Sequence, residues 1–218
     1  MRYHRTILGK KNKDLIIIFP HWNAKDLHCY NVLWDLSRKH CVLLYYYDPD
    51  IVMYNVKETR DNFNIIIDNA CEYIKENHFT SVNALGYSLG TFLSFMLAKK
   101  TDVKKIFLVS SAADFAEVIW TGTSAKETKR QLIMKGETLA TVQKGWKTMA
   151  PITDIDKVKS KISIVFSETD QVVLYKLAKE LLNKLKNYEL KVHRLSHTVL
   201  IVRYLFLTKR IVNFFKEK

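Results

Sequence analysis

The stretch that decides the fold is SVNALGYSLGTFLSFMLAKK, residues 81–100. It predicts a short strand over residues 81–85 and a helix over residues 88–100, with GYSLG at residues 86–90 between them. Small residues two positions before and after Ser88 let the backbone pack closely around a sharp, strained turn. The helix start adds unpaired N–H groups and the positive end of a dipole. This turn therefore favours an exposed hydroxyl beside a place where negative charge can develop.

Strands and helices alternate along the rest of the chain. Apolar runs predict buried strands at residues 15–19 and 41–47, and further strands are predicted at residues 105–110, 162–166 and 190–195. Apolar residues at helical spacing predict helices, over residues 26–39, 58–77, 172–185 and 199–215. This alternation indicates parallel βαβ crossovers. We expect an α/β fold with a mostly parallel, doubly wound sheet of about six to seven strands, in a single domain over residues 1–218.

One segment breaks the alternation. Residues 112–157 contain no predicted strand and two predicted helices, at residues 125–131 and 138–146. An insertion after the carboxyl end of a strand lies over the ligand crevice of an open α/β sheet, so we expect a small helical lid. Its large apolar residues either line a pocket or pack the lid onto the body, and the sequence leaves both interpretations open: Phe115, Val118, Ile119, Trp120, Leu132, Ile133 and Trp146.

The composition excludes several classes of protein. The net charge is +13, but the lysines are scattered, no nucleic-acid motif accompanies them, and a solvated basic surface is the simplest interpretation. Three cysteines without CxxC spacing suggest neither a disulfide framework nor a zinc site. No glycine-rich nucleotide motif and no His/Cys cluster occurs, so we expect no cofactor and no metal.

Two further features concern location. The N-terminal residues have no apolar run long enough for a signal peptide. The apolar stretch at residues 198–207 is interrupted by Arg203 and is too short to span a bilayer. We predict a cytoplasmic protein without stable membrane insertion. The sequence does not decide its oligomeric state.

The GYSLG turn in its strand–helix setting resembles the nucleophile elbow of the α/β-hydrolase superfamily, and the resemblance extends over nearly the whole chain. It implies a serine hydrolase of the esterase or lipase kind, with Ser88 as nucleophile. In that family an acid and then a histidine follow the serine, on loops after later strands. His197 stands after the last predicted strand, in LSHT at residues 195–198, and is the expected base; His193 lies within that strand.

The expected acid is Asp170. It lies in SETDQVV, residues 167–173, which resembles the family's strand, acidic turn and paired valines. Asp170 would orient His197 and stabilise its imidazolium, although an aspartate is also favoured there as a helix N-cap. Glu168 is one rival. Asp114 is the better alternative, because some members of the fold carry the acid after the earlier strand.

The oxyanion hole is the part of the family pattern that this sequence matches least. The pattern requires the backbone N–H of Leu89 and one from the loop after Phe19, for which Trp22 is our candidate. That loop reads PHWN, residues 20–23, where the family usually has a His-Gly pair and a bulky residue. Trp22 is the donor if it aligns with the bulky residue, and aligning His21 with the family histidine shifts the donor by one position. Serines also replace two family glycines, at positions 167 and 196.

We therefore expect hydrolysis of a small-molecule carboxylic ester or thioester through an acyl-enzyme on Ser88. Acyl transfer to an alcohol or amine is a close variant, and a non-catalytic binding module is a second class of function. A third is a peripheral protein held on anionic lipid by its charge and residues 198–210; apolar residues all round that helix favour a buried core helix instead.

Overall fold

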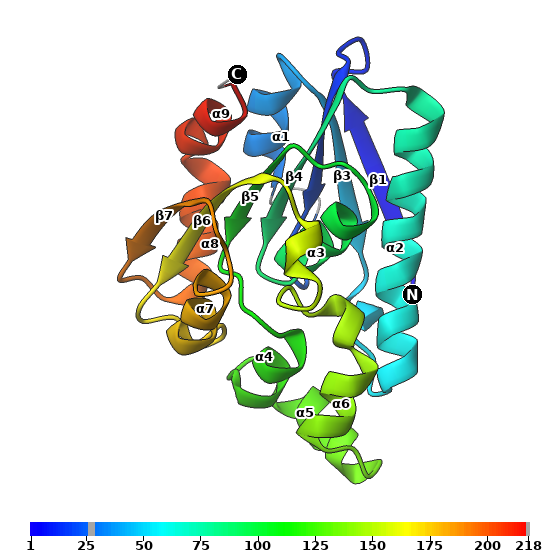
Figure 1. Ribbon diagram of the computed structural model, residues 1–218, viewed down its shortest axis with the longest axis vertical. Helices are drawn as coiled ribbons and strands as arrows, with labels where there is room; N and C mark the ends of the chain where they lie inside the picture. The colour runs from blue at the N-terminus through cyan, green and yellow to red at the C-terminus, as the bar shows by residue number, and fades with distance from the viewer. Residues whose placement is uncertain (26–28, 217–218) are drawn as a thin grey trace.

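The computed structural model describes residues 1–25 and 29–216. Seven strands of these residues form one sheet, in the order β1-β3-β2-β4-β5-β6-β7 (Figure 1). The strand bounds are β1 Tyr3–Leu8, β2 Asp14–Phe19, β3 Cys41–Tyr47, β4 Ser81–Tyr87, β5 Lys105–Val109, β6 Lys161–Ser167 and β7 Tyr188–His193. Strand β1 is antiparallel to β3, and every other pair is parallel. The predicted α/β class and mostly parallel sheet are confirmed.

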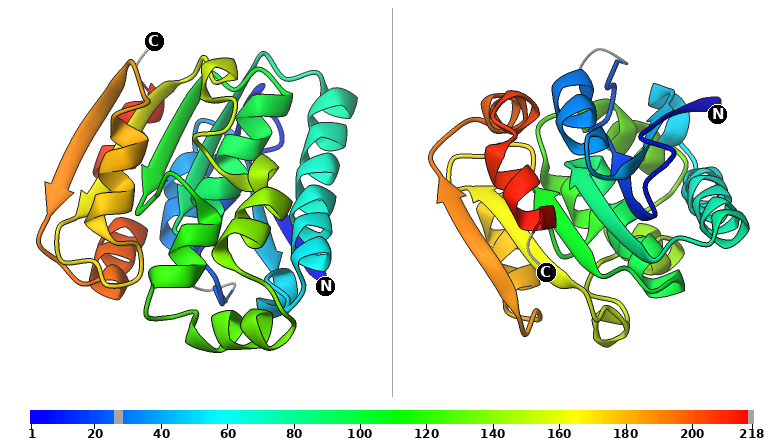
Figure 2. Two further views of the ribbon diagram at one scale, coloured as in Figure 1. Left: turned by 60° about the horizontal axis from the view of Figure 1, so that its bottom comes forward. Right: turned by 90° about the horizontal axis from the view of Figure 1, so that it is seen from above.

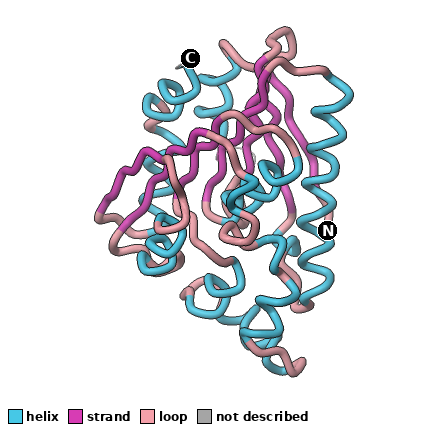
Figure 3. The backbone as a smooth tube through the Cα atoms, viewed as in Figure 1, coloured by secondary structure: helices cyan, strands magenta, loops and turns pink. Residues whose placement is uncertain are grey.

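Helices cover both faces of this sheet (Figure 2 and Figure 3). In β2, Ile17 packs into the core on one face and Ile16 into the core on the other, as the two-residue period of a strand requires. The first core includes helices α2 Val56–Asn77, α3 Leu89–Lys100 and α7 Tyr175–Leu182. The second core includes α1 Tyr30–Ser37, α8 His197–Phe206 and α9 Lys209–Lys216.

The segment between β5 and β6 places its three helices at the carboxyl edge of the sheet, at the bottom of Figure 1, and then runs back past α3 to the start of β6. It contains α4 Phe115–Thr121, α5 Lys126–Met134, α6 Leu139–Gly145 and the short 3-10 turns η3 Lys147–Met149 and η4 Ile155–Lys157. A further 3-10 turn, η2 Pro49–Ile51, follows β3. The two helices predicted in this segment correspond to α5 and α6, whereas α4 was not predicted as a separate helix.

Both edges of the sheet differ from the prediction. Strand β1 was not predicted, and β7 begins and ends two residues earlier than the apolar pattern indicated. Each is an edge strand with mostly exposed or half-buried side chains. Because an edge strand buries little on either face, its hydrophobic pattern specifies its register only weakly.

The helix predicted over residues 199–215 is divided into two helices, α8 and α9. Helix α8 ends at Phe206 because Leu207 leaves the helical region, with φ −91° and ψ 72°. The Thr208 hydroxyl donates a hydrogen bond to Asp35 of α1, and α9 begins at Lys209. Helix α7 is also shorter than predicted, because residues 171–174 form the turn that follows Asp170. The predicted start of the first helix, residues 26–28, lies outside the described residues.

Candidate active site

Ser88 lies on a strained turn between β4 and α3. Its φ of 49° and ψ of −114° belong to a backbone region that residues with a side chain rarely adopt. Gly90 packs directly against the carbonyl oxygen of Phe19, and a Cβ on Gly86 would approach the oxygen of Gly90 to 2.7 Å. The two glycines of the GYSLG stretch are therefore required by close backbone contacts, as the sequence suggested.

The structure brings Ser88, His197 and Asp170 into one chain of hydrogen bonds. The Nε2 atom of His197 is 3.0 Å from Oγ of Ser88, and its Nδ1 atom is 2.7 Å from Oδ2 of Asp170. His197 is the first residue of α8, after the end of β7. The Asp170 side chain is 1% exposed and that of His197 is 15% exposed. Three side chains far apart in sequence therefore meet at the carboxyl edge of the sheet.

Four donors surround the carboxylate of Asp170. Besides His197, the backbone N–H groups of Val172 and Val173 donate to Oδ1 at 2.8 and 2.9 Å, and the Ser110 hydroxyl donates to Oδ2 at 2.7 Å. Burial by itself raises the pKa of this carboxyl, but the bond and charge of His197, with the bonds from Ser110 and Val173, hold the pKa below its ordinary value. Asp170 is therefore ionised at neutral pH.

Ser110 is a residue of this site that sequence analysis missed. It follows β5, is 1% exposed, and its φ is +61°, a conformation that a buried serine seldom adopts. Its Oγ atom also lies 3.3 Å from Nδ1 of His197. The available signal was its position at the end of a predicted strand, at the same sheet edge as Ser88.

The alternative acids lie elsewhere. Asp114 caps α4, where its Oδ1 atom accepts bonds from Ala116 and Glu117, and Nε2 of Gln143 donates to its Oδ2 atom at 3.2 Å. Glu168 accepts a hydrogen bond from the exposed Arg194 at 2.9 Å. Neither carboxylate has a hydrogen bond to His197 in the described part of the chain. His193 belongs to β7, as predicted, but as its last residue, and its ring contacts Tyr204.

Of the two serines that replace family glycines, Ser167 makes hydrogen bonds between two loops and Ser196 adopts an unstrained backbone conformation. The Ser167 hydroxyl donates to the carbonyl of Leu195 at 2.5 Å and accepts from the Leu195 N–H at 2.8 Å, which ties the Asp170 loop to the His197 loop. Ser196 precedes α8 with φ −63° and ψ 160°, a conformation open to any residue. These substitutions therefore leave the geometry of the site intact.

The loop after β2 lies beside the serine. His21, Trp22 and Asn23 line the same pocket as Ser88 and Leu89. The loop is held by hydrogen bonds from the indole of Trp22 to Pro49, at 2.8 Å, and from the Tyr47 hydroxyl to Pro20. Leu89 is the first residue of α3, so its N–H has no acceptor within the helix. Both expected oxyanion donors therefore belong to segments next to Ser88.

A pocket of about 640 Å³ opens over Ser88 and His197. Residues of α4 and of the turn after it line this pocket, and so do residues of α8, which the sequence favoured as a core helix. Its lining consists of apolar and neutral polar side chains with two histidines: His21, Trp22, Asn23, Ser88, Leu89, Phe92, Phe115, Val118, Ile119, Ser124, Ala125, Val172, Val173, His197, Thr198, Ile201, Val202, Leu205 and Phe206. Such a pocket suits a largely apolar, uncharged group.

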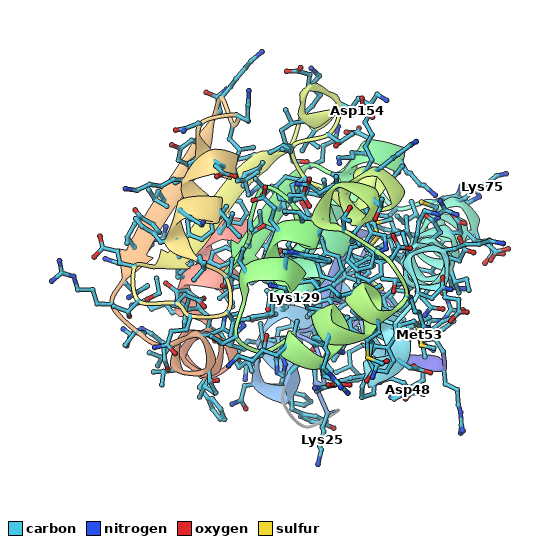
Figure 4. The ribbon with its side chains drawn as sticks, turned by 90° about the horizontal axis from the view of Figure 1, so that it is seen from below. Lys25, Asp48, Met53, Lys75, Lys129 and Asp154 are labelled. Carbon is cyan, nitrogen blue, oxygen red and sulfur yellow. The ribbon has the colours of Figure 1, made fainter. Side chains whose placement is uncertain are left out.

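Both interpretations of the apolar residues at 112–157 hold in part. Phe115, Val118 and Ile119 line the pocket. Trp146 instead packs on Phe115, with ring centroids 5.2 Å apart, and its indole donates to Val56 at 2.8 Å. The remaining three lie outside the pocket lining: Leu132 is buried, Ile133 is exposed, and Trp120 lies beneath the ammonium group of Lys129 (labelled in Figure 4).

Residues 1–25 and 29–216 contain no group of three or more His, Cys, Asp or Glu side chains arranged to hold a metal ion. Within the same ranges, every helix is too short or too polar to cross a membrane.

Several solved structures with a similar fold are α/β hydrolases or esterases. One is MGS-M2, an α/β-hydrolase enzyme from a Medee basin deep-sea metagenome library, with a TM-score of 0.69 and 16% identity over 99% of this chain and 94% of that chain. Another is Est1E from Butyrivibrio proteoclasticus, with a TM-score of 0.63 and 17% identity over 98% of this chain and 91% of that chain.

A third similar structure is a lipase-esterase related protein from Clostridium acetobutylicum, with a TM-score of 0.62 and 16% identity over 97% of this chain and 99% of that chain. No family model and no curated protein matches the sequence. The chain has the α/β-hydrolase fold over its whole described length.

Proposed function

We propose that the protein is a serine hydrolase that cleaves a carboxylic ester or thioester through an acyl-enzyme on Ser88. The observation that carries the proposal is the chain of hydrogen bonds from Ser88 through His197 to the buried Asp170, at 3.0 and 2.7 Å, beside a pocket of about 640 Å³. A weak hydroxyl nucleophile becomes effective when an adjacent base can accept its proton and a third group orients that base.

In the acylation step, Oγ of Ser88 bonds to the carbonyl carbon of the substrate while Nε2 of His197 accepts the hydroxyl proton. Negative charge moves to the carbonyl oxygen, and the backbone N–H groups of Leu89 and Trp22 are our proposed donors to it. When the tetrahedral species collapses, the bond to the alcohol or thiol breaks and His197 returns its proton to that leaving group. The carboxylate of Asp170 remains ionised and stabilises the imidazolium between these steps.

In the deacylation step, a water molecule attacks the acyl carbon and His197 accepts one of its protons. The bond to Ser88 breaks, Oγ of Ser88 takes that proton back, and the carboxylic acid leaves. Ser110 does not exchange a proton in this scheme; its bond to Asp170 keeps the carboxylate aligned with His197. We propose that Ser110 is a positioning residue.

The substrate group in the pocket is proposed to be apolar and uncharged. In the described part of the chain, no Asp, Glu, Lys or Arg side chain lines the pocket. An ionised group placed there would lose its hydration without a partner of opposite charge. We propose that residues 112–157 act as a lid whose α4 forms one wall of an acyl pocket, and that the enzyme is carboxylesterase-like and cytoplasmic.

The test is hydrolysis of p-nitrophenyl esters of two, four, eight and twelve carbons by the wild type and by Ser88→Ala. We expect turnover by the wild type, a preference for acyl groups longer than two carbons, and a loss of about 10⁴-fold or more in kcat in the variant. Product analysis with an added alcohol or amine separates hydrolysis from acyl transfer. If the folded wild type turns over none of these esters, the proposal is wrong and a binding module becomes the better interpretation.

A further inference from the structure

The outer surface of α1 and α8 exposes an unusual number of large apolar side chains. Six of the thirteen that are exposed in the described part of the chain belong to these helices or to the residue that ends α8: Tyr30, Trp34, Val199, Val202, Phe206 and Leu207. Trp34 is 56% exposed and Phe206 is 64% exposed. An exposed apolar area of this kind, on an otherwise charged protein, marks a surface that contacts something other than water.

The two helices present these side chains on the same side of the molecule. The buried residues of α1 and α8 belong to one core on one face of the sheet, so their exposed residues point away from that face. Val199, Val202 and Phe206 are three and four residues apart and share one side of α8, and Tyr30 and Trp34 share one side of α1. The helices pack on each other and are joined by the bond from Thr208 to Asp35. We call these six residues the α1–α8 face.

Positive charge surrounds the α1–α8 face. Residues 197–216 contain four Lys or Arg residues and no Asp or Glu, and Arg203 and Lys209 are exposed. Exposed Arg38 and Lys39 follow α1 directly, and Lys25 projects from the molecule shortly before it (Figure 4). The single acidic residue of α1, Asp35, accepts the hydrogen bond from Thr208.

The α1–α8 face is continuous with the pocket over Ser88. Val202 and Phe206 line the pocket and are also among the exposed residues of this face. A molecule lying against the face would therefore have an apolar path toward Ser88 and His197.

We propose that the α1–α8 face docks the protein on an anionic lipid surface. Exposed Trp, Tyr and Phe side chains are typical of the membrane–water interface, and the surrounding cations match anionic headgroups. A second copy of this chain fits less well, because a two-fold interface would bring the same basic residues of both copies together. The proposal does not depend on the proposed esterase activity.

The experiment uses the full chain and vesicles of phosphatidylcholine, with or without about 30% phosphatidylserine, and measures co-sedimentation at low and high salt. We expect binding to the anionic vesicles alone, and loss of that binding in high salt. The triple variant Trp34→Ser, Val199→Ser, Leu207→Ser and the double variant Arg203→Gln, Lys209→Gln should each bind about tenfold more weakly. None of these five side chains lines the pocket.

Matched controls are Ile65→Ser, an exposed apolar residue of α2 on the opposite face of the sheet, and Lys11→Gln, Lys75→Gln, which remove the same charge elsewhere. Both should bind like the wild type. Equal weakening by the control double variant would mean that net charge alone attracts lipid, and would overturn the assignment to this face. The proposal would also be overturned if the wild type bound no vesicles, or if it formed dimers that the triple variant does not form. Ser88→Ala should bind vesicles normally, which separates this proposal from the esterase proposal.

Discussion

Two aspartates follow neighbouring strands at the same edge of the sheet, and their surroundings shift the pKa values of their carboxyls in opposite directions. Asp114 follows β5 and Asp170 follows β6, and each accepts hydrogen bonds from the backbone N–H groups two and three residues later. Only Asp170 also accepts bonds from His197 and Ser110. Asp114 instead faces Gln143 and lies close to the carboxylate of Glu117.

For this reason the pKa values of the two carboxyls are shifted in opposite directions from the ordinary value of an aspartate. Burial raises the pKa of Asp114, and its bonds from Ala116, Glu117 and Gln143 do not offset that effect. Burial acts on Asp170 in the same sense, but the bond and charge of His197 and the bond from Ser110 outweigh it and lower the pKa. A local turn with two backbone donors is therefore not enough to define a catalytic acid; the partners on the other oxygen decide.

The largest expected effect comes from replacing each aspartate by asparagine. Asp170→Asn should lower kcat by about 10⁴-fold, because the amide can no longer hold the Nδ1 proton of His197 in the required tautomer. Asp114→Asn should change kcat by less than about threefold, because the amide oxygen can still cap α4. Hydrolysis of the best p-nitrophenyl ester measures both. Loss of activity in Asp114→Asn with Asp170→Asn unaffected would reverse the assignment.

The second effect concerns the donor that only Asp170 has. Ser110→Ala should lower kcat by about tenfold with little change in KM, because a bond to a charged carboxylate is lost. The variant also removes one of the hydrogen bonds that lower the pKa of Asp170. Ser110→Gly also removes the hydroxyl but relieves the positive φ. Equal kinetic losses in Ala and Gly variants identify the hydrogen bond as the cause; recovery in Gly would attribute the loss to backbone strain.

A smaller effect distinguishes the structural role of Asp114. Asp114→Ala should lower the free energy of unfolding by about 1 kcal/mol, because the cap of α4 is lost. Asp114→Asn keeps an acceptor for the cap and should lose none of this stability. Urea unfolding followed by circular dichroism measures both variants. A loss in Asp114→Asn as large as in Asp114→Ala would show that the charge matters more than the cap.

The smallest effect is the pH dependence of stability. The lowered pKa of Asp170 adds stability above its unfolded value, near 4, and this contribution is lost as the pH falls through the folded pKa. The raised pKa of Asp114 has the opposite effect on stability. Its buried, ionised carboxylate destabilises the fold at neutral pH, and protonation of that carboxylate removes the cost as the pH falls. Relative to wild type, Asp114→Asn should therefore gain stability at pH 7 and lose the gain near pH 3, by urea unfolding.

The central fold and the three hydrogen-bonded residues could be predicted from the sequence for local reasons. The GYSLG stretch requires a strand before it and a helix after it, because its glycines remove Cβ atoms that would meet Phe19 and Thr91. The parallel strands on either side are buried on both faces, so their apolar runs are continuous. Because these strands are parallel, the loops that carry His197 and Asp170 come to the same edge of the sheet as Ser88.

The features that sequence analysis missed depend on contacts between distant segments. The edge strands β1 and β7 bury few side chains, so their patterns are weak. The division between α8 and α9 depends on the bond between Thr208 and Asp35, 173 residues apart. Ser110 joins Asp170 across 60 residues, and no local pattern identifies a serine hydroxyl as a partner of a carboxylate in another loop.

The measurement that tests the central claim most directly is the rate and position of labelling by a fluorophosphonate, followed by intact-protein mass spectrometry and peptide mapping. We predict one adduct, on Ser88, that is absent in Ser88→Ala. Labelling should be about 10³-fold or more slower in Asp170→Asn and unchanged in Asp114→Asn. An adduct on another residue, or no adduct on the folded wild type, would contradict the assignment of Ser88, His197 and Asp170 as the catalytic residues.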